Sequence, residues 1–282
     1  PDGTRIASFR VTDPRGQGSQ ILVTDPAGIR QLYLAELTDE MPVYLCWSPD
    51  SKMVGWLTQG SDRLIAYCTA ADGAGPIHTL VDGRPLFFTW IGEQVAAYVG
   101  SLAPDSPFDS PRLLVVSPNG GEPVSVHEHP ERFCMPIPVG DELIYVARHG
   151  PQTRMVRTDI HSRVSHAIGE PVDQGDLTGL VINPSGTRIA RAGAPSGEGA
   201  PYHELAIHDL AANTWRSAGV ERCVAFTWCG DDCLIAFVDE PRSEAVRIVV
   251  ITDEGTRALT KFRPSREYTF YLRFFEQFTT SH

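Results

Sequence analysis

Residues 47–57 read Trp47-Ser48-Pro49-Asp50-Ser51-Lys52-Met53-Val54-Gly55-Trp56-Leu57, and this stretch decides the fold. It holds the end of an apolar strand, a turn and the start of a second strand. Proline presets φ at the second position of a type I turn, and aspartate is accepted at the third. We therefore predict a tight hairpin at this point of the chain.

The second strand of this hairpin recurs along the chain. Aligned on a central apolar residue, its copies are 41 to 49 residues apart, at Ile6, Val54, Val95, Ile144, Ile189 and Ile235. A period of roughly 40–50 residues with several strands per copy is typical of propeller blades. Asp72-Gly73 and Asn119-Gly120 are strong signals for further hairpins inside the copies. The sequence therefore predicts an all-β fold, a β-propeller of four-stranded antiparallel blades.

The six copies predict six blades in a single β-propeller domain over residues 1–282. We expect the blades to start near residues 1, 41, 84, 132, 176 and 221. The chain opens inside a turn motif, so we expect it to be excised from a longer chain, and seven blades in the parent are the alternative. Residues 262–282 leave the repeat and are rich in aromatics. We predict that they close the final blade, with a partner-docking patch as the alternative.

The repeat unit resembles a known one. An apolar residue or Trp, then Ser-Pro-Asp-Gly/Ser, then a Lys/Arg-Ile-Ala-Phe-like strand is similar to the WD40-like PD40 repeat of the TolB-like β-propellers. The turn matches well at Pro1-Asp2-Gly3, Ser48-Pro49-Asp50 and Asn183-Pro184-Ser185-Gly186. The resemblance implies a non-catalytic propeller that binds a protein or peptide through a loop-bearing face or a central funnel. Propeller domains of prolyl-oligopeptidase-like serine peptidases carry the same repeat, so a substrate-gating propeller is the alternative.

The charge of the chain restricts its partners. With 35 acidic and 24 basic residues the formal net charge is −11, which disfavours nucleic acid and anionic membranes. No run approaches the roughly 20 apolar residues that would span a bilayer. We expect a protein or peptide partner, basic or neutral, and no bound cofactor. The oligomeric state and the compartment, bacterial cytoplasm or periplasm, stay open.

Catalytic motifs are missing from the sequence. It contains neither a G-x-S-x-G elbow nor a glycine-rich phosphate loop, so we assign no catalytic residue. The paired carboxylates Asp231-Asp232 and Asp239-Glu240 are expected to be solvated. The cysteines show no metal-ligand spacing and are predicted to be buried thiols, with a Cys229–Cys233 disulfide as the alternative: Cys46, Cys68, Cys134, Cys223, Cys229 and Cys233.

Two long loops rich in Pro and Gly follow second strands, and such loops often bind ligands. The candidate binding residues are Asp105, Phe108 and Asp109 in the loop 103–111, and Tyr202 and His203 in the loop 195–203. Surface decoration is the alternative.

One short stretch could hold a metal ion. His127 and His129 lie on one side of an extended chain and precede Glu131, a set that suits zinc or a similar ion. This would make the chain a metal-dependent propeller lyase or hydrolase. The alternative is a solvated loop between two blades.

Overall fold

The computed structural model describes residues 2–12, 18–100, 111–127, 130–131, 136–173, 179–195, 203–240 and 245–263. All regular elements in these ranges are β-strands, and no helix occurs in them. Within the same ranges there is accordingly no helix suited to crossing a membrane. The predicted all-β class is confirmed.

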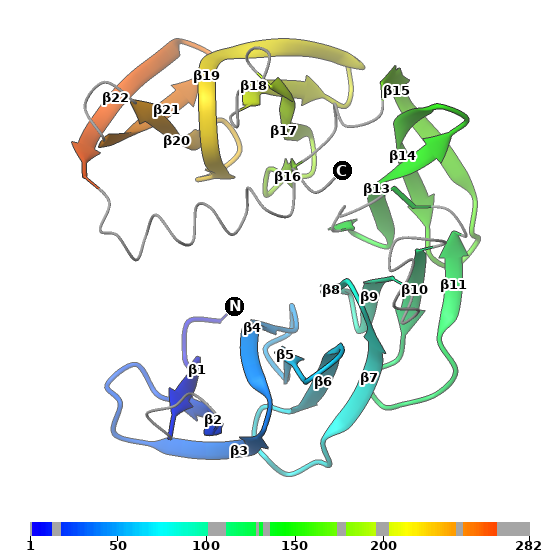
Figure 1. Cartoon of the computed structure of the whole chain (residues 1–282), viewed down its shortest axis with the longest axis vertical. Coiled ribbons are helices and arrows are strands. Elements are labelled where there is room, and N and C mark those ends of the chain that lie inside the picture. The colour runs from blue at the N-terminus through cyan, green and yellow to red at the C-terminus, as the bar shows by residue number, and fades with distance from the viewer. Residues whose placement is uncertain are drawn as a thin grey trace. The chain divides into compact units, whose positions relative to one another are not determined.

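The strands form antiparallel sheets in the order of the chain, as the blades of a β-propeller do (Figure 1). The first sheet contains β1 (Ile6–Val11), β2 (Gly18–Thr24) and β3 (Gln31–Thr38). The second contains β4 (Met41–Trp47), β5 (Met53–Gln59), β6 (Leu64–Ala70) and β7 (His78–Gly83). The third contains β8 (Leu86–Ile91), β9 (Gln94–Val99), β10 (Arg112–Val116) and β11 (Val124–His127).

The later strands form one four-stranded and one seven-stranded sheet. The former contains β12 (Ile137–Val139), β13 (Glu142–His149), β14 (Gln152–Asp159) and β15 (Ser165–Asp173). The latter contains β16 (Gly179–Ile182), β17 (Arg188–Pro195), β18 (His203–Asp209), β19 (Thr214–Trp228), β20 (Leu234–Glu240), β21 (Ala245–Thr252) and β22 (Gly255–Phe262). The predicted four-stranded antiparallel blade is therefore the building unit of the chain.

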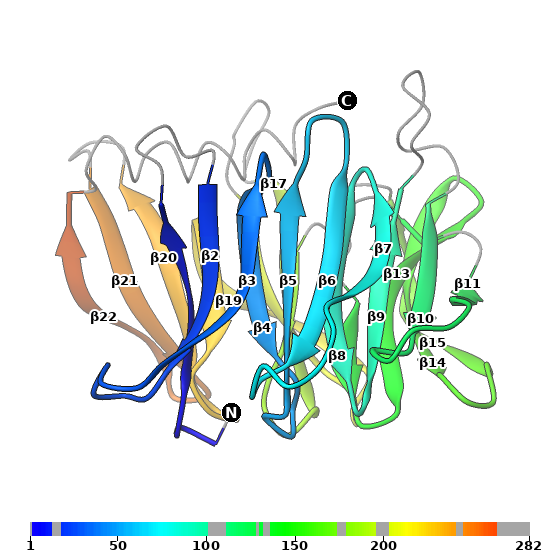
Figure 2. The ribbon, with the colours of Figure 1, turned by 90° about the horizontal axis from the view of Figure 1, so that it is seen from below.

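The chain divides into two compact units. Unit 1 comprises Pro1–Tyr145 and Arg157–Ser165, and unit 2 comprises Val146–Val156 and His166–His282. In unit 1, Figure 2 shows β4, β5 and β6 side by side, as their pairing requires. Each unit buries apolar side chains of its own between neighbouring sheets, such as Phe88 and Val95 in unit 1 and Leu205 and Ala236 in unit 2.

The hairpin around Pro49 is present. The Ser51 amide donates to the Ser48 carbonyl at 3.0 Å, which closes the turn. The Asp50 carboxylate accepts from the Ser48 hydroxyl at 2.7 Å and from the Lys52 amide at 3.1 Å. These bonds lower the pKa of Asp50 to about 2, the Ser48 bond contributing most. Ser51 has a φ of 60°, in the left-handed region.

Tryptophan side chains link neighbouring first strands in both units. In unit 1, Trp90 at the end of β8 donates its indole N–H to the Cys46 carbonyl of β4 at 3.4 Å. In unit 2, Trp228 at the end of β19 donates to the Val181 carbonyl of β16 at 2.9 Å. These bonds satisfy the indole N–H and tie each sheet to the one before it.

β19 is the longest described strand, with 15 residues, and it is shared by two four-stranded blades, which it joins into the seven-stranded sheet. Its first part pairs with β18 and its second part, from Cys223, pairs with β20. Figure 1 shows it in yellow, curving from the sheet of β16–β18 to that of β20–β22. Position 221, near which the sequence predicts the start of a blade, lies inside this strand.

The described cysteines are all free thiols. Cys68 and Cys223 are buried as predicted, and burial raises the pKa of both thiols to about 12. Cys229 is exposed, so the expectation of a buried thiol is wrong there. Its amide donates to the Cys233 carbonyl at 2.7 Å, and both thiols of this turn remain free. Cys134 lies outside the described residues.

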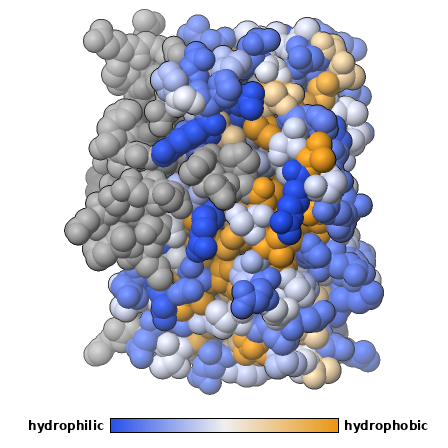
Figure 3. All heavy atoms as spheres, turned by 90° about the vertical axis from the view of Figure 1, so that its right-hand side faces the viewer, coloured by the Kyte–Doolittle hydropathy of each residue, from blue (hydrophilic) through white to orange (hydrophobic). Residues whose placement is uncertain are grey.

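Large hydrophobic side chains also reach the surface. Ile29 is 82% exposed, and Met41, Ile77 and Val164 are about half exposed. On the face drawn in Figure 3, hydrophobic side chains in orange lie between hydrophilic ones in blue. Single exposed hydrophobic residues of this kind are normal and do not by themselves mark a site.

Candidate functional site

Most of the site residues predicted from sequence lie outside the described part of the chain. This holds for Asp105, Phe108, Asp109, Tyr202 and His129. His203 is the first residue of β18, and His127 is the last residue of β11, where it is paired with Leu113. The loop and metal assignments therefore stay predictions.

Of the predicted metal-binding set, Glu131 is buried. It is only 6% exposed, so this carboxylate is not solvated. Among the residues that the structure describes, no group of three or more His, Cys, Asp or Glu side chains could hold a metal ion.

The described residues do contain a cavity, in unit 2, at a bend of β19. The register of β19 against β18 shifts before and after Leu205 of β18, so that β19 has extra residues at this point. Gly219 and Arg222, with φ of 66° and 59°, lie in these bulges. Bulges with left-handed residues bend a strand and re-aim its side chains. The bend opens a cavity of about 490 Å³.

The floor of this cavity is apolar. Val220, Val238 and Val249 line it, and each is at most 5% exposed. Ala258 of the exposed strand β22 forms part of the wall. The Thr256 hydroxyl donates to the Ala218 carbonyl at 3.2 Å and so connects β22 to the bulge. Most of the remaining lining is polar or charged, so the cavity combines a small apolar floor with a largely polar wall.

The two arginines at the cavity are held by carboxylates of β20. Arg222 Nη2 lies 2.8 Å from Asp239 Oδ2, and Arg247 Nε lies 3.1 Å from Glu240 Oε1. Lys261 also pairs with Glu240. Asp239 and Glu240 are thus engaged in ion pairs and about a quarter exposed or less, contrary to the expectation that they are simply solvated.

Two further carboxylates line the cavity. Glu204 of β18 accepts a hydrogen bond from the Ser217 hydroxyl at 2.6 Å, and Glu221 lies on β19 beside the bend. Within the described ranges, neither forms an ion pair with a basic side chain. After the internal pairing, the cavity therefore keeps an excess of negative charge. Sequence reasoning missed this site, because its lining comes from five strands and no local motif marks it.

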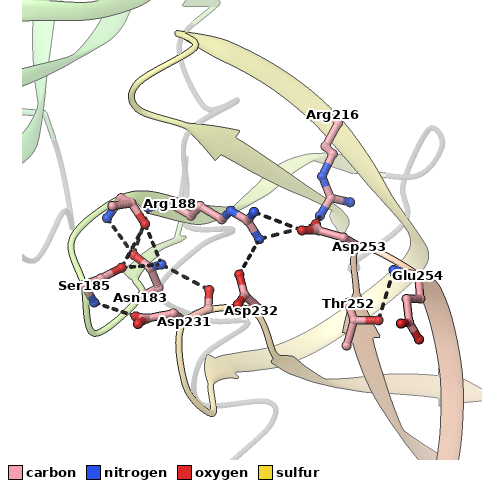
Figure 4. A network of polar contacts seen from close by, with 10 residues as sticks. Asn183, Ser185, Arg188, Arg216, Asp231, Asp232, Thr252, Asp253 and Glu254 are labelled. Atoms are coloured by element: carbon pink, nitrogen blue, oxygen red, sulfur yellow. Dashed lines mark hydrogen bonds and ion pairs between the residues drawn. The ribbon is translucent and has the colours of Figure 1, made fainter.

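A second polar cluster of unit 2 joins three turns (Figure 4). Arg188 lies 3.2 Å from Asp232 Oδ1 and 3.0 Å from Asp253 Oδ2. Arg216 approaches the other oxygen of Asp253 at 2.8 Å. Each arginine in this cluster has a carboxylate partner, and these ion pairs connect the three turns.

The turn between β16 and β17 is tied to the same cluster. The Asn183 side chain donates to the Asp231 carbonyl at 3.1 Å, and the Ser185 amide donates to the Asp231 carboxylate at 2.7 Å (Figure 4). Asp231 and Asp232 are exposed, as expected of solvated carboxylates, and both also form contacts with the neighbouring turn. In unit 1, Arg5 occupies the place of Arg188 in a similar turn and donates to the Ser51 carbonyl at 2.6 Å.

One buried histidine of unit 2 carries no site. His208 of β18 is 0% exposed and lies edge-on to Trp215 at 4.3 Å, and the Arg191 guanidinium covers that ring at 4.1 Å. Burial lowers the pKa of His208, and Arg191 lowers it further, while Asp209 and Asn213 act in the opposite direction. The side chain is an interior group of the sheet packing.

Comparison with known proteins supports the fold. No family model and no curated protein matches the sequence. Among solved structures, TolB from Acinetobacter baumannii is similar with a TM-score of 0.56, 12% identity, 92% of this chain and 65% of that chain covered. The β-propeller domain of the Trilobed protease from Pyrococcus furiosus is similar with a TM-score of 0.62, 14% identity, 94% of this chain and 83% of that chain covered.

Acylaminoacyl peptidase from Pyrococcus horikoshii is also similar, with a TM-score of 0.62, 15% identity and 92% of this chain covered. The chain spans 44% of that peptidase and 65% of TolB, less than two thirds of each. At these identities the likeness shows a TolB-like β-propeller fold.

Proposed function

We propose that this chain is a non-catalytic TolB-like propeller that binds a protein or peptide. The observation that carries the proposal is the cavity at the β19 bend, with its buried valine floor and its polar surround. A volume of about 490 Å³ accommodates one or a few side chains of a bound segment. The likeness to TolB and the lack of a serine-nucleophile motif in the sequence support a binding role.

Selection of a random peptide library on the whole chain tests this function. Ala258 lines the cavity from an exposed strand, so Ala258→Trp fills the cavity with little effect on the core. We expect this variant to lose at least tenfold in affinity for the selected peptides. Leu259→Trp is the matched control, because Leu259 is 52% exposed and does not line the cavity. Equal binding by both variants and the unchanged chain would refute a binding role for the cavity.

The loops predicted from sequence are a separate part of the proposal. Alanine substitution across residues 103–111, which include Asp105, Phe108 and Asp109, and across 195–203, which include Tyr202 and His203, tests them with the same peptides. We expect weaker binding if the partner reaches the loop-bearing face. Unchanged affinity would remove these loops from the site and leave the cavity untouched.

A second candidate is a substrate gate in a serine peptidase. The similarity to the acylaminoacyl peptidase and to the Trilobed protease domain favours it, since both are peptidases. Treatment of the full gene product with a fluorophosphonate probe, which labels active serine hydrolases, separates the two functions. Labelling would assign the chain to a peptidase, and its absence together with peptide binding would support the non-catalytic role.

A further inference from the structure

We propose that the cavity at the β19 bend receives a lysine or arginine side chain from a basic segment of the partner. This inference rests on the proposed function and names the chemistry of the bound segment. It follows from the charges of the lining, the character of the floor and the charge of the chain.

The first argument is the balance of charge. Each cavity arginine has a carboxylate of its own at salt-bridge distance, Asp239 for Arg222 and Glu240 for Arg247. An acidic ligand would meet arginines whose charge is already balanced and would lie beside the carboxylates of Glu204 and Glu221. Glu204 and Glu221 have no such basic partner among the described residues, so a cationic ligand group gains an ion pair without breaking one.

The second argument is the apolar floor. Val220, Val238 and Val249 present methyl groups beside these carboxylates. Lysine and arginine place an aliphatic stem on apolar surface and keep the charged head at a polar rim. The cavity offers both surfaces at once, whereas a small inorganic cation would use only the carboxylates.

The third argument is the charge of the whole chain. A formal charge of −11 raises the rate of encounter with a basic partner, and the effect falls with ionic strength. The arrangement of the cavity and the long-range field therefore favour the same partner, a basic peptide segment.

Three fluorescein-labelled nonapeptides test the inference by fluorescence anisotropy. They share a frame of serine and valine, and their central residue is lysine, norleucine or glutamate. We expect the lysine peptide to bind at least about threefold more tightly than the norleucine peptide, as ion pairs with two exposed carboxylates imply. Glu204→Gln together with Glu221→Gln should remove this preference, while Glu170→Gln together with Glu254→Gln, the same change in charge at exposed positions outside the cavity lining, should retain it.

The outcomes separate the two proposals. Equal affinity for lysine and norleucine peptides, with both lost in Ala258→Trp, overturns the basic ligand and keeps peptide binding. An unchanged lysine preference in the Glu204→Gln, Glu221→Gln variant also overturns the inference. Binding of none of the three peptides overturns it as well, and the library selection then decides on peptide binding itself.

Discussion

The hydroxyl of Tyr44 makes two hydrogen bonds with the backbone of Phe88. It accepts from the Phe88 amide at 2.7 Å and donates to the Phe88 carbonyl at 3.0 Å, and the two rings stack at 5.3 Å. Tyr44 lies on β4 and Phe88 on β8, so one side chain satisfies both polar groups of a residue in the neighbouring sheet. Burial raises the pKa of this hydroxyl well above its usual value.

Tyr44→Phe should destabilise the protein by about 1–3 kcal/mol, because it leaves two buried backbone groups of Phe88 without their partner. Urea unfolding followed by circular dichroism measures the loss. Tyr33→Phe is the control, since its hydroxyl bonds only to Glu36 at 3.4 Å on the surface and its removal should cost less than about 0.5 kcal/mol. Similar losses in both variants would contradict the role of Tyr44.

Gly55→Ala should cost about 1–3 kcal/mol. A Cβ at this position of β5 would lie 2.9 Å from a ring carbon of Phe88, and that ring is fully buried. Gly60→Ala is the matched control, because its Cβ would meet only the Arg63 carbonyl at 3.5 Å. Equal midpoints of urea unfolding for the two variants would show that the Phe88 ring can move aside without loss of stability.

We expect the free energy of unfolding to fall as the pH drops below 6.5, because of the protonation of His208 in the unfolded chain. Its pKa is lowered in the folded protein, so below 6.5 the unfolded chain binds a proton that the folded protein does not take up. Unfolding free energies between pH 5 and 8 measure this dependence. His208→Phe should flatten the slope near pH 6, and His161→Gln, at an exposed turn, should leave it as it is. A slope that survives in His208→Phe must come from other groups.

Arg188→Met should weaken the cluster of Figure 4 by about 1 kcal/mol at low salt and by less at high salt. The arginine is 22% exposed and joins Asp232 and Asp253. Arg63→Met is the comparison, since its ion pair with Asp82 at 2.8 Å joins side chains that are 46% and 40% exposed and should contribute less than about 0.5 kcal/mol. A smaller loss for Arg188→Met than for Arg63→Met would refute cooperation within the cluster.

The hairpins could be predicted from the sequence because their information is local. Proline and aspartate at positions 49 and 50 fix a turn through their own backbone preferences, and the hydrogen bonds around Ser48 follow from them. The same holds for β5 after the turn, where residues 54–58 are all buried. Periodicity and turn residues were therefore enough for the fold class.

The cavity could not be predicted in this way. It depends on bulges that put Gly219 and Arg222 in the left-handed region, and on side chains from β18, β20, β21 and β22. Gly219 is a residue type that often marks a bulge, but Arg222 is an ordinary residue for a strand, and neither indicates which other strands line the cavity. The ion pairs of Asp239 and Glu240 could not be predicted from the sequence either, because their basic partners lie on other strands.

The uninterrupted course of β19 determines how this region opens. The first part of β19 is the last strand of one blade, and its second part is the first strand of the next blade. The hydrogen bonds between strands therefore continue without a break from β16 to β22. Amide protons on both sides should then exchange with solvent in one cooperative event rather than sheet by sheet. For protein engineering, neither sheet can be swapped or excised alone, because the cut would fall within a strand that both require.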